Sequence, residues 1–216
     1  MFITLDGCDG CGKSTQQKRL GHSFQSQGYE VVLCHDPGST ALGNKIRHIL
    51  LHGHELRIDN KTEMFLFMAA RTQMVEEVIR PALNDQKIVI SDRFLISNFV
   101  YQGYAGGISL NTLETIGQIA VEDIMPDLAV ILDIPYEIAV QRIVNRDASD
   151  RMEQKGEKYH RQVRNGFLQY AAIHQTHCVV IDAAPPPNNV EIAIQNVIHE
   201  RYGIDFPFPL SENNCC

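Results

Sequence analysis

The chain has 216 residues, of which 44% are hydrophobic, and a formal net charge of −7 at pH 7. This length and composition suit one domain with a full apolar core, and the acidic balance argues against a broad nucleic-acid-binding surface. No apolar run approaches the roughly 20 residues of a membrane-spanning helix, and the N-terminus carries no recognisable signal peptide. We therefore expect a cytoplasmic protein that binds neither nucleic acid nor a membrane.

The first predicted strand, residues 2–5, leads into a phosphate-binding loop. Residues 7–14 read GCDGCGKS, which fits the pattern G-x-x-x-x-G-K-[ST], and a predicted helix follows over residues 13–27. Glycines allow backbone N–H groups to point at phosphate oxygens, and the helix N-terminus adds partial positive charge. In this pattern Lys13 reaches the β- and γ-phosphates, and the Ser14 hydroxyl ligates Mg²⁺. The residues predicted to bind Mg-ATP are Gly7, Cys8, Asp9, Gly10, Cys11, Gly12, Lys13, Ser14 and Thr15.

Cys8 and Cys11 of this loop form a C-x-x-C pair. Half a zinc site and a redox motif are both alternatives for such a pair. A second C-x-x-C that would complete four zinc ligands is missing from the sequence. We therefore interpret both cysteines as residues of the phosphate loop, with redox sensitivity as a minor alternative.

Four further aliphatic runs predict buried strands, at residues 30–34, 87–91, 128–132 and 178–181. Helical patterns separate them, at residues 41–51, 62–83, 110–124, 136–144, 157–175 and 188–202. Strands that alternate with helices predict an α/β fold with a five-stranded parallel sheet and helices on both faces, hence three layers. Ligands of such folds bind beyond the carboxyl ends of the strands. Acidic residues at or near these ends are Asp6, Asp36, Asp92 and Asp133.

A phosphate-binding loop does not by itself name a reaction. A GTPase would need an N-K-x-D motif on a later strand, and the one partial match, residues 60–63, precedes the third strand. The chain instead resembles the thymidylate kinase family over nearly its whole length. Besides the loop, the matching segments are DPGST at 36–40, KIR at 45–47, FMAAR at 67–71, SDRF at 91–94, YQG at 101–103, PDL at 126–128 and DRME at 150–153. The resemblance implies a P-loop NTPase fold, a homodimer, and Mg-ATP-dependent phosphorylation of dTMP to dTDP.

Phe67 and Arg71 are four residues apart on a predicted helix and therefore share one face. A ring that stacks on a base, beside a guanidinium that donates to a base carbonyl, makes a pyrimidine pocket. The family resemblance implies this role for both residues. On composition alone Phe67 also suits the core, whereas an arginine among apolar residues needs a partner.

Asp92 and Arg93 follow the third predicted strand. A carboxylate at this strand end, opposite the phosphate loop, can hold Mg²⁺ through water, and Arg93 can bind the acceptor phosphate as a fork. The alternative is a structural ion pair. Arg47 is a second candidate for the same phosphate, because transfer brings two anions together.

Further along the chain, the family resemblance implies that Ser97, Tyr101 and Gln102 line the nucleoside. Tyr101 would occupy the space of a ribose 2′-hydroxyl and so favour deoxyribose, although it also suits ordinary packing. Asp9 and Asp36 are expected near the transferred phosphate and the sugar 3′-hydroxyl. The acceptor is already an anion, so catalysis should rest on positioning and charge neutralisation.

Arg142, Arg146 and Arg151 form a second basic cluster. The resemblance implies a mobile lid, about residues 142–156, that supplies an arginine to the transferred phosphoryl because the phosphate loop has none. Arg142 is expected to bind ATP, and Arg146 and Arg151 are expected to be catalytic, as are Asp9, Lys13 and Arg93. The alternative is that these cations complement a helix dipole. We expect one kinase domain over residues 1–205, which includes the lid, and a tail over 206–216.

Two residues depart from the family pattern. His35 precedes the DPG segment where an arginine is usual, and Gly106 also lies where an arginine is common. A protonated His35 would partly replace the missing charge, with activity that depends on pH near 6.5. Two alternatives to a dTMP kinase remain at this point: a kinase for another nucleoside monophosphate, and a non-catalytic nucleotide-binding regulator.

Overall fold

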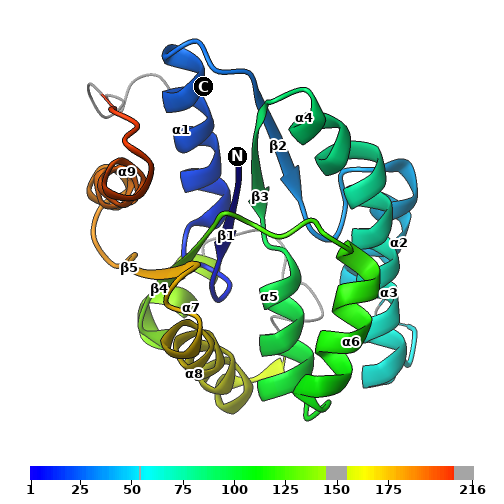
Figure 1. Ribbon diagram of the computed structural model, residues 1–216. Coiled ribbons are helices and arrows are strands. Elements are labelled where there is room, and N and C mark those ends of the chain that lie inside the picture. The colour runs from blue at the N-terminus through cyan, green and yellow to red at the C-terminus, as the bar shows by residue number, and fades with distance from the viewer. Residues whose placement is uncertain (54, 145–154, 207–216) are drawn as a thin grey trace.

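The computed structural model describes residues 1–53, 55–144 and 155–206. Its sheet has five parallel strands in the order β2-β3-β1-β4-β5 (Figure 1). They are β1 (Phe2–Asp6), β2 (Val31–His35), β3 (Ile88–Asp92), β4 (Leu128–Asp133) and β5 (Cys178–Asp182). The predicted parallel sheet is confirmed.

Each strand runs one residue further toward its carboxyl end than the apolar pattern predicts. The added residue is Asp6, His35, Asp92, Asp133 or Asp182. The backbone of these polar residues still pairs within the sheet, as where Asp92 lies opposite both Leu5 and His35. Apolar patterning marks only the apolar residues of a strand, so it stops one residue short of the polar end whether that residue is exposed or, like Asp6, buried.

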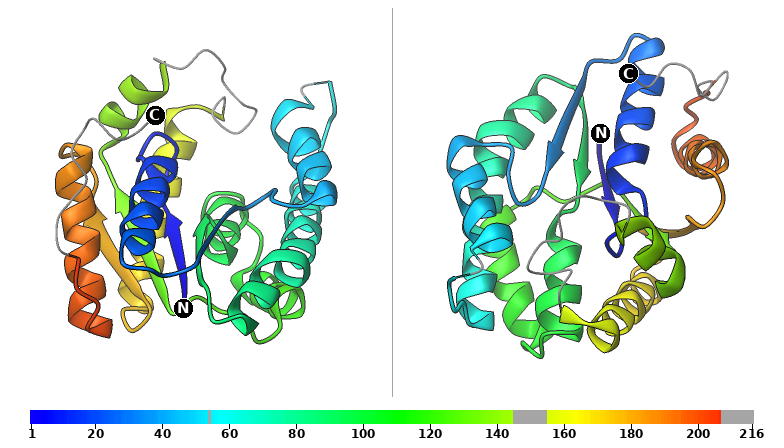
Figure 2. Two further views of the ribbon diagram at one scale, coloured as in Figure 1. Left: turned by 90° about the horizontal axis from the view of Figure 1, so that it is seen from above. Right: turned by 180° about the vertical axis from the view of Figure 1, so that it is seen from behind.

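Helices cover both faces of the sheet (Figures 1 and 2). On one face, α1 (Lys13–Ser26) packs beside α9 (Pro187–Tyr202). The helices of the opposite face are α3 (Asn60–Met74), α4 (Arg80–Asn84), α5 (Leu95–Asn98), α6 (Leu110–Val121) and α8 (Glu157–Ile173), with α2 (Ala41–His52) packed against α3 and α7 (Tyr136–Val144) against α8. This arrangement follows from right-handed crossovers between parallel strands.

The helix predicted over residues 62–83 is present, but its hydrogen-bond pattern is irregular. The Asp59 side chain accepts from the backbone N–H groups of Lys61 and Thr62, so α3 begins two residues earlier than predicted. A π-helical turn, η1 (Val75–Ile79), then precedes Pro81 in α4. Proline has no N–H to donate to the preceding turn, which explains why the regular hydrogen-bond pattern is interrupted there.

A second π-helical segment, η2 (Phe99–Tyr104), continues directly from α5 after β3. The segment is almost fully buried and packs against α6 and α8. It carries Tyr101 and Gln102 of the predicted nucleoside-binding side chains, whereas Ser97 lies on α5.

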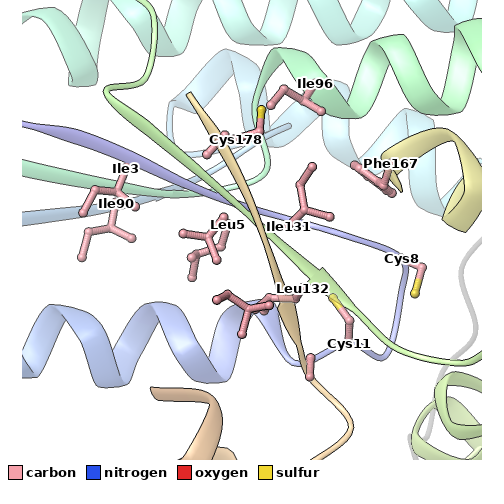
Figure 3. Close-up of a cluster of buried hydrophobic side chains, with 14 of the residues drawn as sticks. Ile3, Leu5, Cys8, Cys11, Ile90, Ile96, Ile131, Leu132, Phe167 and Cys178 are labelled. Atoms are coloured by element: carbon pink, nitrogen blue, oxygen red, sulfur yellow. The ribbon is translucent and has the colours of Figure 1, made fainter. Parts of the chain in front are cut away.

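The main core lies between the sheet and its helices and extends into the phosphate loop (Figure 3). Cys8 and Cys11 are only 7% and 2% exposed and belong to this core. Gly7 has a φ of 139°, and a Cβ there would lie 2.5 Å from the carbonyl oxygen of Leu132 on β4. The loop therefore presses closely against the sheet, and its cysteine side chains point into the core rather than outward.

Candidate active site

One cavity lies at the carboxyl ends of the strands. Its lining includes the following predicted residues: Asp9, Gly10, Gly12, Lys13, Ser14, Thr15, Asp36, Arg47, Phe67, Arg71, Asp92, Arg93, Ser97, Tyr101 and Gln102. The fold thus brings the phosphate loop, the ends of β2 and β3, α3 and the α5–η2 segment to a single place. His35, Pro37, Leu51 and Asn98 also line the cavity, although the sequence analysis assigns the last three no role.

Lys13 is held against its own loop. Its Nζ donates to the carbonyl oxygens of Gly7 at 3.2 Å and Cys8 at 2.9 Å. The side chain is 7% exposed and lines the cavity beside the N-terminus of α1. The ammonium group is therefore placed where an anion at the loop would meet it.

The Ser14 hydroxyl donates to Asp92 Oδ2 at 2.6 Å. One residue comes from the start of α1 and the other from the end of β3, 78 positions apart in the sequence. A hydroxyl and a carboxylate are the hard oxygen donors that Mg²⁺ prefers. The pair therefore suits the ion that the phosphate-loop motif implies.

Arg93 turns back over the phosphate loop from the end of β3. Its φ of 69° lies in the left-handed region, which is unusual for a residue with a side chain. Its guanidinium donates to Asp9 Oδ1 at 2.5 Å, to the Tyr101 hydroxyl at 3.0 Å and to the Gly7 carbonyl at 3.1 Å. The ion pair that we considered as an alternative role for Arg93 is thus present, and it lies on the wall of the cavity.

The pKa of the Asp9 carboxyl is strongly affected by these neighbouring charges. Burial alone would raise the pKa of its carboxyl, but the charges of Arg93 and Lys13 outweigh burial and lower the pKa to about 2. Asp9 also accepts a hydrogen bond from the Tyr101 hydroxyl at 3.2 Å. At neutral pH Asp9 is therefore an anion that holds Arg93 and Tyr101 in place.

Ser97 connects the cavity wall to the sheet. Its hydroxyl donates to Asp6 Oδ1 at 2.8 Å and accepts from Arg93 at 3.2 Å. Burial raises the pKa of Asp6, although the hydrogen bond from Ser97 and the charge of Arg93 act in the opposite direction. Ser97 is thus committed to two protein partners.

The partner that an arginine at position 71 requires is Asp36. Arg71 Nε lies 2.5 Å from Asp36 Oδ2, and each side chain is 1% exposed. Arg71 also donates to the carbonyl oxygen of Phe94 at 3.3 Å. The other carboxylate oxygen, Asp36 Oδ1, is buried without a hydrogen-bond partner among the described residues. This oxygen is an acceptor available to a ligand.

Asn98 also lines the cavity, and none of the sequence motifs includes it. Its Nδ2 donates to Gln102 Oε1 at 2.9 Å, whereas its Oδ1 is buried with no partner in the described part of the chain. A buried acceptor without a partner is costly unless a ligand supplies a donor. Only the i, i+4 spacing to Gln102 could have drawn attention to it.

Arg47 and Phe67 flank the opposite wall. Arg47 donates to the carbonyl oxygen of Pro37 at 2.9 Å. Phe67 is half-buried, packs against the main core and also lines the cavity. One part of the Phe67 ring therefore packs in the core and another part stays accessible to the cavity, and its stacking on a base stays a prediction.

A second pocket lies on the other side of the phosphate loop. It is lined by loop residues, by Thr15 and Gln16, and by residues 183–187 after β5. Arg142 also lines it and donates to the carbonyl oxygens of Ala183 and Ala184, both at 3.0 Å. Arg142 thus stabilises the loop of residues 183–187 that follows β5. Arg146, Arg151 and most of the predicted lid fall outside the described residues.

The two departures from the family pattern have physical explanations. Burial and the charge of Arg47 lower the pKa of His35 below its usual value, which favours the neutral ring, and the pH dependence expected of a protonated His35 stays a prediction. A Cβ on Gly106 would lie 2.7 Å and 2.8 Å from the carbonyl oxygens of Gln102 and Tyr101. The π-helical turn therefore leaves no room for an arginine at position 106.

Comparisons with known proteins show the family to which the chain belongs. The family model described as thymidylate kinase matches residues 5–194. A thymidylate kinase of Maridesulfovibrio salexigens is 37% identical over 213 residues, which cover 95% of this chain and 98% of that protein. One of Rhodopirellula baltica is 45% identical over 185 residues, which cover 85% of this chain and 74% of that protein. The crystal structure of thymidylate kinase from Ehrlichia chaffeensis is similar with a TM-score of 0.76 at 29% identity, covering 92% of this chain and 98% of that one.

Proposed function

The chain belongs to the thymidylate kinase family and is an ATP-dependent dTMP kinase, and from this premise we propose which residues bind and align its two substrates. The observation that carries the proposal is the cavity that joins the phosphate loop to a buried polar wall on α3 and α5–η2. The phosphate loop lies at one end of this cavity, and the side chains that we propose to recognise the base lie at the other. The reaction moves the γ-phosphoryl group of ATP to a phosphate oxygen of dTMP.

ATP binds with its phosphates in the loop and its adenine in the second pocket. The loop contributes the backbone N–H groups of residues 7–15, and Lys13 exchanges its carbonyl partners for the β- and γ-phosphates. Because the cysteine side chains point into the core, Cys8 and Cys11 contribute backbone only. Arg142 holds residues 183 and 184 against the adenine pocket. Arg146 and Arg151 are proposed, from the family resemblance alone, to neutralise the transferred phosphoryl.

Ser14 and Asp92 would hold Mg²⁺, with the hydroxyl as a direct ligand and the carboxylate through water. Bound there, the ion neutralises charge on the phosphates of ATP. Removal of divalent ions with EDTA should abolish turnover, and Mg²⁺ should restore it. Asp92→Asn should raise the Mg²⁺ concentration needed for half-maximal rate.

dTMP lies along the rest of the cavity. Arg93 and Arg47 bind its phosphate, and the free oxygen of Asp36 accepts from the sugar 3′-hydroxyl. Phe67 stacks on the base and Arg71 donates to a base carbonyl. Asn98 Oδ1, which has no partner among the described residues, accepts a hydrogen bond from a base that carries an N–H donor, as thymine does at N3.

Chemistry then depends on alignment rather than on a general base, because the attacking phosphate oxygen is already an anion. Asp9 stays ionised and holds the Arg93 guanidinium toward the space between the two phosphates. Closure of the proposed lid, about residues 142–156, would exclude water and so suppress ATP hydrolysis.

A coupled ADP-release assay tests the proposal with dTMP, dUMP, dCMP, dGMP and AMP as acceptors. We expect strong stimulation by dTMP with dTDP as the product, weaker stimulation by dUMP, and little by the purines. A clear preference for AMP or dGMP would refute the base assignment. A lack of stimulation by every acceptor would favour the regulator instead.

The enzyme is further proposed to be a homodimer. Phe65 on α3 is 57% exposed, which is costly for a large aromatic side chain unless a partner covers it. Two other apolar side chains, Leu42 and Ile49 of the adjacent helix α2, are also exposed. Light scattering after size exclusion should give twice the chain mass, and Phe65→Glu should shift it toward the monomer.

A further inference from the structure

We propose that Glu63, which does not line the cavity, determines which base the cavity accepts by fixing the orientation of two side-chain amides. The inference rests on the proposed function, since it takes a pyrimidine monophosphate as the acceptor. Glu63 is therefore a positioning residue for substrate specificity. It acts through Gln102 and Asn98.

Glu63 lies on α3 and is 2% exposed. Its Oε1 accepts from Gln102 Nε2 at 2.9 Å and lies 3.5 Å from Lys155 Nζ. A carboxylate offers only acceptor oxygens. The amide of Gln102 must therefore turn its NH₂ group toward Glu63, because the opposite orientation would set two acceptor oxygens against each other in a buried place.

The orientation of the Gln102 amide in turn fixes the orientation of the Asn98 amide. With its NH₂ group held by Glu63, Gln102 presents Oε1 to Asn98, and Oε1 accepts from Asn98 Nδ2 at 2.9 Å. Asn98 must use its NH₂ group in that contact. Its Oδ1 is the atom left over, and it is buried without a partner among the described residues.

The chemical consequence concerns the ring nitrogen N3 of the substrate. Asn98 lines the cavity and offers an acceptor, which matches the N3–H donor of thymine. Cytosine has a lone pair at N3, so it would meet a second acceptor and leave both groups unpaired. If both amides were free to flip, Asn98 would offer an N–H instead and would suit cytosine. Glu63 removes that freedom.

The test is Glu63→Gln, because a glutamine at this position can donate as well as accept and so permits both orientations. The probe pair is dTMP and 5-methyl-dCMP, which differ only at N3 and at the 4-substituent. We expect the ratio of kcat/KM for dTMP to that for 5-methyl-dCMP to fall about tenfold, as for the loss of one directed hydrogen bond. Glu114→Gln, which neutralises an exposed glutamate on α6, is the matched control and should keep the wild-type ratio.

A second variant distinguishes the proposed effect on selectivity from a general loss of structure. Exchanging the two side chains, as Glu63→Gln with Gln102→Glu, keeps the charge and the atoms but moves the acceptor-only group next to Asn98. The carboxylate at position 102 again demands the Asn98 NH₂ group, so the selectivity ratio should recover even if the rates stay low. An unchanged ratio in Glu63→Gln, or a ratio that falls in Glu63→Gln but does not recover in the exchanged variant, would overturn the proposal. Failure of the proposed function would appear separately, as wild-type enzyme that dTMP does not stimulate.

Discussion

The Arg93 guanidinium lies 2.5 Å from the Asp9 carboxylate and joins the end of β3 to the phosphate loop. The same guanidinium stands 4.9 Å from the centre of the Tyr101 ring. One cation thus ties together the loop, a strand end and the α5–η2 segment. This contact is structural, and we propose that it also places the guanidinium for the two substrate phosphates.

Asp9→Asn should weaken the fold in a pH-dependent way. The folded state lowers the pKa of Asp9 from 3.8 to about 2, so its contribution is present above pH 4 and is lost as pH falls through about 2. We expect the variant to be less stable by about 2 kcal/mol at pH 7, since each pKa unit corresponds to about 1.4 kcal/mol. Urea unfolding of both proteins at pH 7 and pH 3 measures this, and the difference should shrink at pH 3. An equal difference at both values would contradict the pKa shift.

Lys13→Ala should reduce dTMP-dependent ADP release at least about a hundredfold, because it removes the charge next to the β- and γ-phosphates. Lys18→Ala is the matched control, since Lys18 is exposed on the same helix. It should retain the wild-type rate. Turnover close to that of the wild type in Lys13→Ala would remove the basis for the phosphate assignment.

Arg71→Ala should affect both binding and stability. The variant leaves Asp36 buried beside an empty space, which costs about 3–5 kcal/mol in comparable ion pairs. dTMP binding should weaken by about 1–3 kcal/mol, with ATP affinity nearly unchanged. Calorimetric titration and urea unfolding separate the two effects.

The control for Arg71 is the double variant Arg71→Gln with Asp36→Asn. It has no unpaired buried charge, so much of the stability should return while dTMP binding stays weak. Equal weakening for ATP and dTMP would instead point to a general disturbance of the cavity.

Tyr101→Phe and Tyr101→Ala should differ in their sugar selectivity. Loss of the hydroxyl removes contacts with Asp9 and Arg93, which should lower kcat several-fold. The ring remains in Tyr101→Phe, so the preference for dTMP over 5-methyluridine monophosphate should persist. Tyr101→Ala opens space at the sugar and should reduce that preference. If both variants keep it, the ring does not exclude ribose.

Much of the architecture is local in origin and could be predicted from the sequence. The phosphate loop, the five strands and the α-helices follow from residue types at short spacing, which act through backbone freedom, apolar patterning and helix propensity. The family resemblance also allowed the cavity residues to be predicted. Its motifs lie at the carboxyl ends of the strands, and in a parallel sheet these ends meet at one edge. Boundaries were less certain, as the polar residue at the end of every strand shows.

The tertiary structure decided what depends on partners distant in sequence. Composition at position 71 required a partner but did not name Asp36, 35 residues away, and nothing near Glu63 indicates that it accepts from Gln102 across 39 residues. The lowered pKa of His35 and the lack of room at Gly106 likewise arise from packing. Sequence pattern determined the fold and the reaction, because these depend on local backbone geometry and on motif chemistry. Burial and long-range hydrogen bonds decided which way each polar group points, because those energies exist only once the chain is folded.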